Sequence, residues 1–236
     1  MKIAIHQPQY WPWPPYLHKV MYADVFVYLD TVQFNKNGLQ NRNQVKTNKG
    51  ATWLTLPVRQ RLGQSISGTR VADLKALAKH FKTLSMSYSG RPGFERWKTE
   101  LENVLTPDTD SLCAIAIKST EWMLEKLGVQ TRRIRASEVQ GNTGRGSVLI
   151  ASICKSLGAT LYLSGRGALQ YMNPDDFDQI GCKIIVQSWR PFTYEQAHPE
   201  VGFTKDLSTL DLLLNCPETA AEMIRAAGDW QIYSPQ

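Results

Sequence analysis

The sequence predicts an α/β protein with a Rossmann-like, mostly parallel sheet flanked by helices. Two short apolar runs rich in β-branched and aromatic side chains, KIAIH (2–6) and VFVYLD (25–30), are typical of buried strands. The segment between them, 14–22, has room for two helical turns, and Pro15 is tolerated in a first turn. Farther along, strand-like and helix-like segments alternate, which is the pattern of a doubly wound sheet.

The other elements follow from the spacing of apolar residues. Helical spacing predicts helices at 70–85, 93–104, 110–127 and 146–157. Alternation or short apolar runs predict strands at 52–58, 132–137, 160–165 and 183–189. The stretch 31–50 has five Asn and three Gln with little periodicity, so we expect a long polar loop, which is uncommon in a compact domain unless it binds something.

A chain of 236 residues suits one large domain or one domain with a small appendage. We expect a Rossmann-like catalytic domain over 1–205, with a helical insertion at about 70–128. The segments LSTLDLLLN (207–215) and PETAAEMIRAAG (217–228) predict a small helical C-terminal extension over 206–236, with Pro217 at a helix start.

Composition predicts a protein of the cytoplasm that has no membrane partner. We expect no secretory leader, because residues 1–10 show no apolar leader-like segment, and no apolar run is long enough to cross a bilayer. Its four cysteines are spread singly, so we expect reduced, mostly buried thiols and no structural metal. The net charge is +6, and seven basic residues with no acidic one lie between Asp30 and Asp73. This excess favours phosphate-bearing ligands, although a solvated basic face or an RNA contact would give the same pattern.

The first candidate site lies at the end of the first predicted strand, where open α/β sheets bind ligands. His6 and Gln7 occupy this end, and His18 follows in the predicted helix. The loop between them is stiff and aromatic, and Tyr10 and Tyr16 are candidate binding residues in it and just after it. A packing loop around a hydrogen-bonded histidine is the alternative interpretation.

The second candidate site follows the second predicted strand. Asp30, Gln33 and Asn41 suit hydrogen bonds to sugar hydroxyls or a nucleotide. Arg42 and Lys46 suit phosphate oxygens, the first as a bidentate fork and the second as a point charge. A plain polar loop is the alternative.

A third candidate is the turn Ser164–Gly165–Arg166 after a later strand, where glycine lets backbone amides approach an anion. We expect the segments near 6, 18, 42 and 165 to converge on one cleft that receives an anion. Asp211 and Asn215 lie one turn apart on a predicted helix, and either reach this site or pair locally.

Nearly the whole chain resembles the WbqC-like family, which occurs in gene clusters for bacterial surface polysaccharides. The resemblance rests on IAIHQPQYWPWPPYLHKVMYADVFVYLD, VQF, NRNQVKT, WLTLPV, ICKSLGATLYLSGRGALQYM and LSTLDLLLNC. It implies a role in lipopolysaccharide (O-antigen) synthesis, on a nucleotide-linked amino sugar that receives a glycyl or other acyl group.

A more distant similarity is to pantoate–β-alanine ligases, Rossmann-like enzymes of the HIGH nucleotidyl-transferring class. It rests on the order of His18, ADVFVYLDTVQF and YLSGRG, and implies ATP with Mg²⁺ as a cofactor. The paired HxGH histidines of that class are absent, because His18 stands alone.

Three functional hypotheses follow. The first is an amide-forming transferase or ligase, with His6, His18 and Arg42 as catalytic residues and an acyl or amino-acid donor. The second is a transferase that takes its donor from aminoacyl-tRNA bound to the basic segment. The third is a non-catalytic protein that binds sugar nucleotides or acts as a scaffold in the same pathway. The sequence does not specify the sugar, the donor or the oligomeric state.

Overall fold

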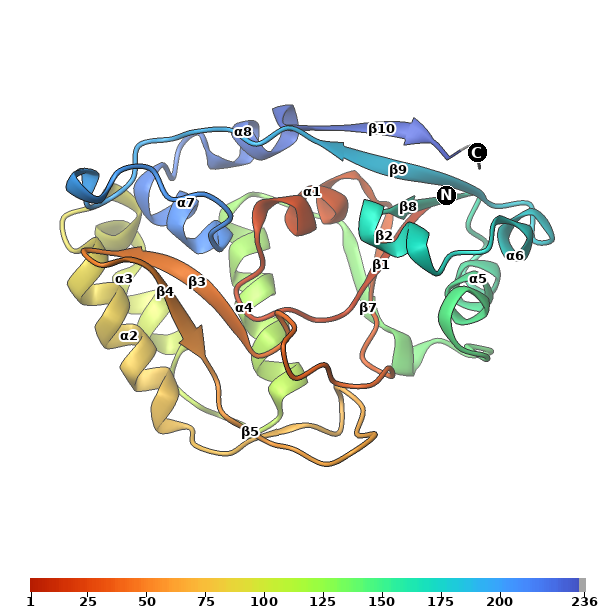
Figure 1. The fold of residues 1–236 in the computed structure, drawn as a ribbon, viewed down its shortest axis with the longest axis horizontal. Helices are drawn as coiled ribbons and strands as arrows, with labels where there is room; N and C mark the ends of the chain where they lie inside the picture. The colour runs from red at the N-terminus through yellow and green to blue at the C-terminus, as the bar shows by residue number, and fades with distance from the viewer. Residues whose placement is uncertain (234–236) are drawn as a thin grey trace.

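The central feature of the fold is a six-stranded sheet in the order β10-β9-β8-β1-β2-β7. The computed structural model describes residues 1–233 (Figure 1). The sheet strands are β1 (Lys2–His6), β2 (Val25–Tyr28), β7 (Arg132–Arg135), β8 (Leu161–Ser164), β9 (Lys183–Trp189) and β10 (Gly228–Ile232). All neighbours are parallel except β10, which runs antiparallel to β9. The predicted α/β class with a mostly parallel sheet is confirmed.

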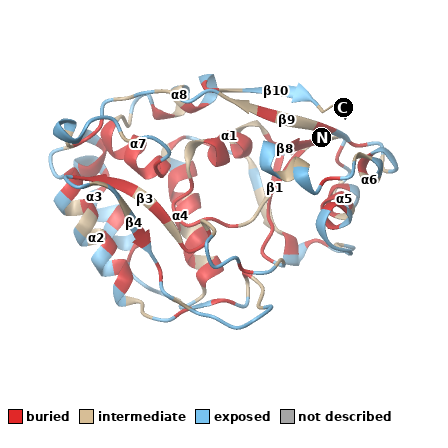
Figure 2. Cartoon of the chain, in the orientation of Figure 1, coloured by how far each residue is buried: buried red, intermediate tan, exposed pale blue. Residues whose placement is uncertain are grey.

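Alternate residues of the central strands enter two separate cores, as the pleat requires. Ala4 and Phe26 face the core that contains α1 (Pro14–Tyr22) and α4 (Leu112–Lys126). Ile3 and Val25 face the core under α5 (Gly146–Ser156) and α6 (Pro174–Asp178). Helices therefore cover both faces of the sheet, and the central strands β1, β2 and β8 are largely buried, whereas the edge strand β10 is largely exposed (Figure 2).

The polar segment after β2 does not stay a loop. It contains β3 (Arg42–Thr47), which pairs with β4 (Gly50–Thr55) in a separate antiparallel hairpin. The expected third strand is therefore not part of the main sheet. Polar side chains of β3 form hydrogen bonds with groups far away in the sequence, which stabilises the strand. For example, the Asn43 amide donates to the Trp11 carbonyl oxygen at 2.7 Å.

Helices between β6 (Arg70–Val71) and β7 pack beside this hairpin. They are α2 (Lys75–Tyr88), α3 (Pro92–Val104) and α4, which lie on the opposite side of the molecule from α5 and α6 (Figure 1). The predicted helix at 70–85 thus begins five residues late, because 70–71 pair with β5 (Val58–Arg59) instead.

The C-terminal segment is not purely helical as expected. It contains α7 (Thr209–Asn215) and α8 (Ala220–Ala226), but β10 then joins the main sheet along β9. Helix α8 starts three residues after Pro217. The expectation that 206–236 is helical was therefore wrong for residues 228–232. These residues form a strand because the edge of β9 offers them hydrogen-bonding partners. Residues 234–236 lie outside the described part.

Two other expectations concern the chain as a whole. The four cysteines are free, and three of them are buried, as predicted. Within residues 1–233, no helix combines the length and apolar character that a membrane span requires.

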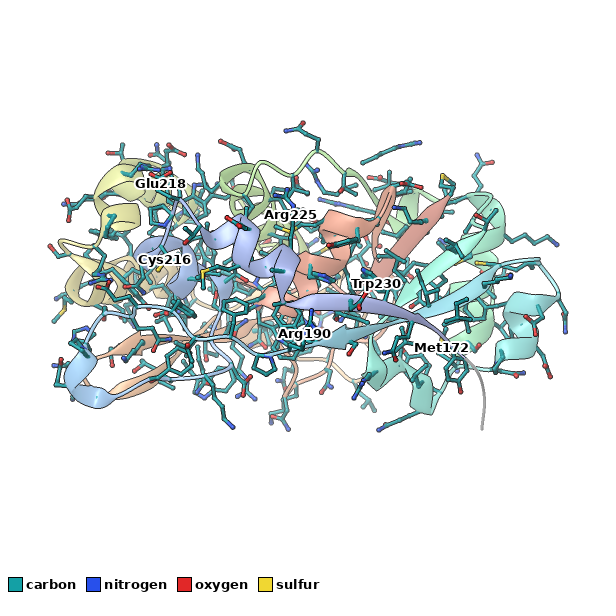
Figure 3. All side chains as sticks on the ribbon, turned by 90° about the horizontal axis from the view of Figure 1, so that it is seen from above. Met172, Arg190, Cys216, Glu218, Arg225 and Trp230 are labelled. Atoms are coloured by element: carbon teal, nitrogen blue, oxygen red, sulfur yellow. The ribbon has the colours of Figure 1, made fainter. Side chains whose placement is uncertain are left out.

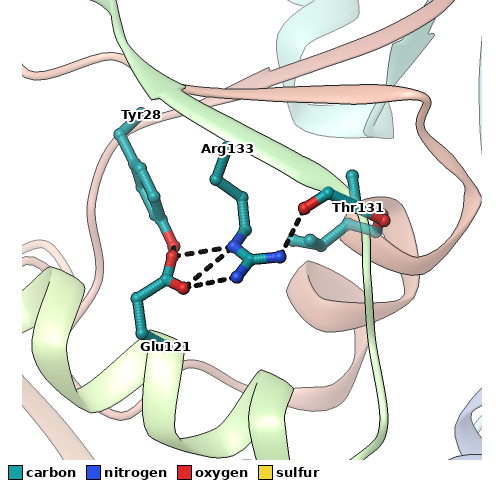
Figure 4. Close-up of polar contacts among 5 residues, drawn as sticks. Tyr28, Glu121, Thr131 and Arg133 are labelled. Atoms are coloured by element: carbon teal, nitrogen blue, oxygen red, sulfur yellow. Dashed lines mark hydrogen bonds and ion pairs between the residues drawn. The ribbon is translucent and has the colours of Figure 1, made fainter.

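A polar cluster fastens α4 to the sheet (Figure 4). The Arg133 guanidinium of β7 contacts both carboxylate oxygens of Glu121, with Nη2 at 2.7 Å. The Tyr28 hydroxyl of β2 donates to the same carboxylate at 2.7 Å. Bidentate geometry makes this pair stronger than an ordinary surface ion pair.

We expect Glu121→Gln to lower the free energy of unfolding by about 1–2 kcal/mol, since the amide cannot accept the same set of charged bonds. Urea unfolding of the wild type and the variant measures this. The matched control is Glu125→Gln, whose carboxylate is exposed and pairs with Lys126 at 2.9 Å. Equal losses for both variants would contradict the role given to the Glu121 cluster.

Candidate active site

A cavity of about 470 Å³ lies at the carboxyl ends of β1 and β8. Strand β1 leads through α1 to β2 on one side, whereas β8 lies on its other side and is reached through α5 on the opposite face. The connections after β1 and β8 therefore diverge at this point, and residues that follow both strands line the cavity. Ligands of open α/β sheets bind at such switch points.

Five Trp and Tyr side chains contribute to the cavity walls. The lining residues are Ile5, His6, Gln7, Trp13, Pro15, Tyr16, Lys19, Leu29, Ile150, Tyr162, Gly165, Arg166, Gly167, Ala168, Tyr171, Gln187 and Trp189. No Asp or Glu is among them, so the titratable groups of the wall are histidine, lysine, arginine and tyrosine. Aromatic rings suit the faces of sugars and bases, and the absence of carboxylates from the lining favours anionic ligands.

Lys19 is the cation inside the cavity. Its side chain is 6% exposed, and within residues 1–233 it forms no salt bridge. Its Nζ lies beside Gly165, where a Cβ would come within 3.5 Å of it. Burial lowers the Lys19 pKa from 10.5 to about 7. A buried ammonium without a carboxylate is costly, and an anionic ligand would relieve that cost.

His6 faces Lys19 from the end of β1. Its Nδ1 lies 3.0 Å from the Gln7 carbonyl oxygen, so Nδ1 carries the proton and donates it there. The Nε2 lone pair is then available as an acceptor. Burial, and next the nearby Lys19 charge, lower the His6 pKa to about 3, so the imidazole is neutral near pH 7. The Tyr16 ring holds the imidazole in edge contact, with centroids 4.8 Å apart.

Five predicted site residues line this cavity: His6, Gln7, Tyr16, Gly165 and Arg166. Gln7 is oriented by Gln40, whose Nε2 donates to Gln7 Oε1 at 2.7 Å. The segments near 6 and 165 therefore converge, as expected. Arg166 is exposed, which places its guanidinium at the solvent side of the site.

His18 does not line the cavity. Residues adjacent on a helix point about 100° apart, and it is Lys19 that faces inward. The His18 ring is fully buried and stacks on Trp230, with centroids 5.4 Å apart. Trp230 lies on β10 (Figure 3). Its Nδ1 lies 2.8 Å from Gln187 Nε2. Burial lowers its pKa to about 4.

Several other predicted residues serve the scaffold. Asp30 is buried and accepts from the backbone N–H and hydroxyl of Ser137, at 3.0 and 2.7 Å. The Asn41 amide donates to the Leu56 carbonyl oxygen at 2.8 Å, and the Tyr10 hydroxyl pairs with His80 Nδ1 at 2.9 Å. The remaining two are exposed Gln33, whose backbone bridges to Ser65, and buried Ser164, whose hydroxyl donates to the Gly165 carbonyl oxygen at 3.2 Å.

The expectation that Arg42 and Lys46 share the cleft was wrong. Both lie on β3, beside α2 and α3 rather than β8. Arg42 stacks over the Trp53 ring at 4.5 Å. Lys46 is buried and donates to the Gly202 carbonyl oxygen at 2.6 Å. The physical reason is that this polar segment forms a hairpin of its own, which carries these cations away from the sheet.

Asp211 and Asn215 form a buried network away from the cavity. Asp211 accepts hydroxyl hydrogens from Tyr88 and, at 2.7 Å, from Tyr194. Asn215 Nδ2 donates to the Asp211 carbonyl oxygen at 2.7 Å, and its Oδ1 accepts from the Ala197 N–H at 2.9 Å. Of the two alternatives, pairing within the scaffold is the one observed.

Sequence reasoning missed Lys19, Gln187 and Trp189. Lys19 sits beside the more conspicuous His18, and the helix register that turns it inward depends on packing against β1. Gln187 and Trp189 lie at the end of a strand that was predicted, so the rule that ligands bind at strand ends was the available signal.

The sheet and cavity together define a mostly parallel α/β protein with a ligand-sized site at its switch point. The model of the WbqC-like protein family matches residues 7–223. The chain belongs to this family, as the sequence resemblance predicted.

One relative covers nearly the whole chain. The uncharacterized protein Rv1507c of Mycobacterium tuberculosis (strain ATCC 25618 / H37Rv) is 28% identical over 229 residues, which are 95% of this chain and 97% of the relative. The two chains thus align from end to end. No solved structure gives a significant match.

Proposed function

We propose that the chain is an enzyme that transfers an acyl or aminoacyl group to the amine of a nucleotide-linked amino sugar in the synthesis of bacterial surface polysaccharide. The observation that carries the proposal is Lys19, a buried ammonium without a carboxylate partner, opposite the neutral imidazole of His6. Lys19 favours an anion and His6 Nε2 accepts a hydrogen bond, so the two groups suit a substrate that carries both a phosphate and an amine. Membership in the WbqC-like family supports the pathway.

The chemistry assigns a role to each group. The amine nitrogen of the sugar forms a bond to the acyl carbonyl carbon, and the bond from that carbon to its leaving group breaks. His6 Nε2 accepts a hydrogen bond from the attacking amine and orients it, and the proton that the amine loses departs with the leaving group. Lys19 stabilises negative charge on a phosphate or on the acyl oxygen, and in this dry site its charge is weakly screened. The aromatic wall orients the sugar and base.

ATP with Mg²⁺ remains a candidate for activating the donor. Lys19 and Arg166 suit phosphate oxygens. No carboxylate lines the cavity, so the ligands of Mg²⁺ would come largely from the phosphates themselves. When bound, ATP would convert a carboxylate donor into an acyl-adenylate; a donor that arrives activated needs no ATP.

The test begins with binding. We expect UDP-glucosamine or a dTDP-4-amino sugar at about 100 times its Kd to stabilise the protein by about 2.7 kcal/mol, measured by thermal shift. Product is then sought by mass spectrometry with glycine and ATP–Mg²⁺, or with glycyl-tRNA. Product from either donor supports acyl transfer, and the required donor separates ligase from aminoacyl-tRNA transferase. Binding without product under every donor contradicts the enzymatic proposal and favours a non-catalytic sugar-nucleotide protein.

A further inference from the structure

The Gln187 side chain has only one orientation compatible with its neighbours. Its terminal nitrogen lies 2.9 Å from the Pro15 carbonyl oxygen, which can only accept a hydrogen bond. The atom there must therefore be the amide NH₂. The second hydrogen of the same NH₂ points to His18 Nδ1 at 2.8 Å. Both donors are used, and the amide cannot flip without losing both bonds.

His18 is restricted in the same way. Because its Nδ1 accepts from Gln187, its proton is on Nε2, which lies against the Gly228 backbone. A methyl group on Gly228 would fall within the His18 ring, so the close approach requires glycine. Rings of Tyr22 and Trp230 enclose the imidazole, with centroids 4.5 and 5.4 Å away. The contact of Nδ1 with Gln187 sets the neutral tautomer, whereas Nε2 has no hydrogen-bond partner among residues 1–233 and is held against the Gly228 backbone by packing.

These contacts leave the Gln187 carbonyl oxygen as the free polar atom of the side chain. Gln187 lines the cavity, and within residues 1–233 its Oε1 receives no hydrogen bond. This oxygen is not fully enclosed by protein atoms, so a ligand in the cavity can reach it. A fixed acceptor on the wall selects for a hydrogen-bond donor on the ligand, because a ligand without one would leave the oxygen desolvated and unpaired.

We propose that Gln187 Oε1 accepts a hydrogen bond from the amine of the substrate, and that His18 is the positioning residue that holds this oxygen toward the cavity. The proposal rests on the proposed function, in that the ligand carries an amine as well as an anionic group. Lys19 and Gln187 then divide the recognition: the ammonium of Lys19 binds the anion, and the Gln187 carbonyl binds the donor. His18 acts only through Gln187.

The proposed contact between Gln187 and the ligand is tested with UDP-glucosamine and UDP-glucose. The first carries an amine where the second carries a hydroxyl. We expect Gln187→Met to weaken UDP-glucosamine about 10- to 100-fold and UDP-glucose about threefold, because a charged donor loses more than a neutral one. Titration calorimetry gives both Kd values. If Gln187→Met weakened the binding of both sugar nucleotides by a similar factor, the proposal would be overturned. It would also be overturned if the wild type bound neither sugar nucleotide, or did not bind glucosamine 1-phosphate.

The positioning half is tested by rescue. His18→Phe removes the acceptor for the Gln187 amide, and we expect it to reduce the preference for UDP-glucosamine over UDP-glucose as Gln187→Met does. His18→Asn places an amide oxygen near the former Nδ1, and should retain most of the preference. Tyr22→Phe keeps the ring against His18 and is the matched control. Equal preference in the Phe and Asn variants would assign His18 to packing alone and overturn this half.

A measurement on the wild type tests the orientation of His18 and Gln187 even if the variants do not fold. The ¹⁵N shifts of the His18 ring should show the Nε2-protonated neutral tautomer from pH 6 to 8, whether or not any ligand is present. Titration near pH 6.5, or a proton on Nδ1, would overturn the orientation. Failure of the proposed function looks different: glucosamine 1-phosphate binds and distinguishes wild type from Gln187→Met, yet no sugar nucleotide is acylated.

Discussion

Replacing Lys19 with methionine is expected to weaken the binding of UDP-glucosamine by about 30- to 150-fold, since a hydrogen bond to a charged group contributes roughly 2–3 kcal/mol in a site of this kind. Methionine has a similar length and fits among the aromatic residues around the helix, so the wall should be preserved. Titration calorimetry at pH 6.5 measures the loss. The control is Lys36→Met, which removes an exposed charge outside the cavity. Equal Kd values for wild type and Lys19→Met would contradict the proposed anion contact.

The same substitution has an effect on stability that needs no ligand. The Lys19 pKa is 10.5 in the unfolded chain and about 7 in the folded protein. Between these values the unfolded chain binds more protons, so the free energy of unfolding of the wild type rises with pH from about 7 to 10. Below pH 7 both states are protonated, and the cost of the buried charge is fully present and no longer changes.

We therefore expect Lys19→Met to be more stable than the wild type at pH 6, and the difference to shrink as pH rises toward 10. Urea unfolding of the two proteins at several pH values measures it. Taking the difference between them cancels the titration of the other groups. A difference that is constant with pH would mean that Lys19 is not a buried cation.

Gly93→Ala is expected to be the most destabilising single methyl addition, with a loss of at least 3 kcal/mol. Gly93 starts α3 where this helix crosses α7. A Cβ there would lie 2.8 Å from Leu214 Cα and closer still to the Leu213 carbonyl oxygen. Both are backbone atoms, so no rotamer change can relieve the clash, and the two helices would have to separate.

Thermal and urea unfolding measure this loss. Gly167→Ala is the control, because its Cβ would meet no atom within 4 Å and its φ is not positive. We expect its stability to stay within about 0.5 kcal/mol of the wild type. If Gly93→Ala unfolds at the same urea concentration as this control, the contact between α3 and α7 is looser than described.

The parallel strands at the centre of the sheet, and the strand ends at which the cavity lies, could be inferred from the amino-acid sequence. The middle of the run 2–6 and residues 25–29 are continuously apolar, a pattern that is typical of a strand buried on both faces. Once β1 was identified, the position of His6 and Gln7 at its end followed from topology, as did the Gly165 turn after β8. These predictions depend on local composition and on chain order, both of which a sequence contains.

Which polar residues share the cavity depends on contacts between elements that are far apart in the sequence. Arg42 and Lys46 lie on β3, whose sequence RNQVKT lacks the alternation of apolar and polar residues that marks a strand. The local sequence therefore does not distinguish a binding loop from a hairpin. Likewise, one residue of helix register separates Lys19 in the cavity from His18 beneath it. The register is fixed by packing of α1 against β1 and α8, and the contacts with α8 join residues about two hundred positions apart.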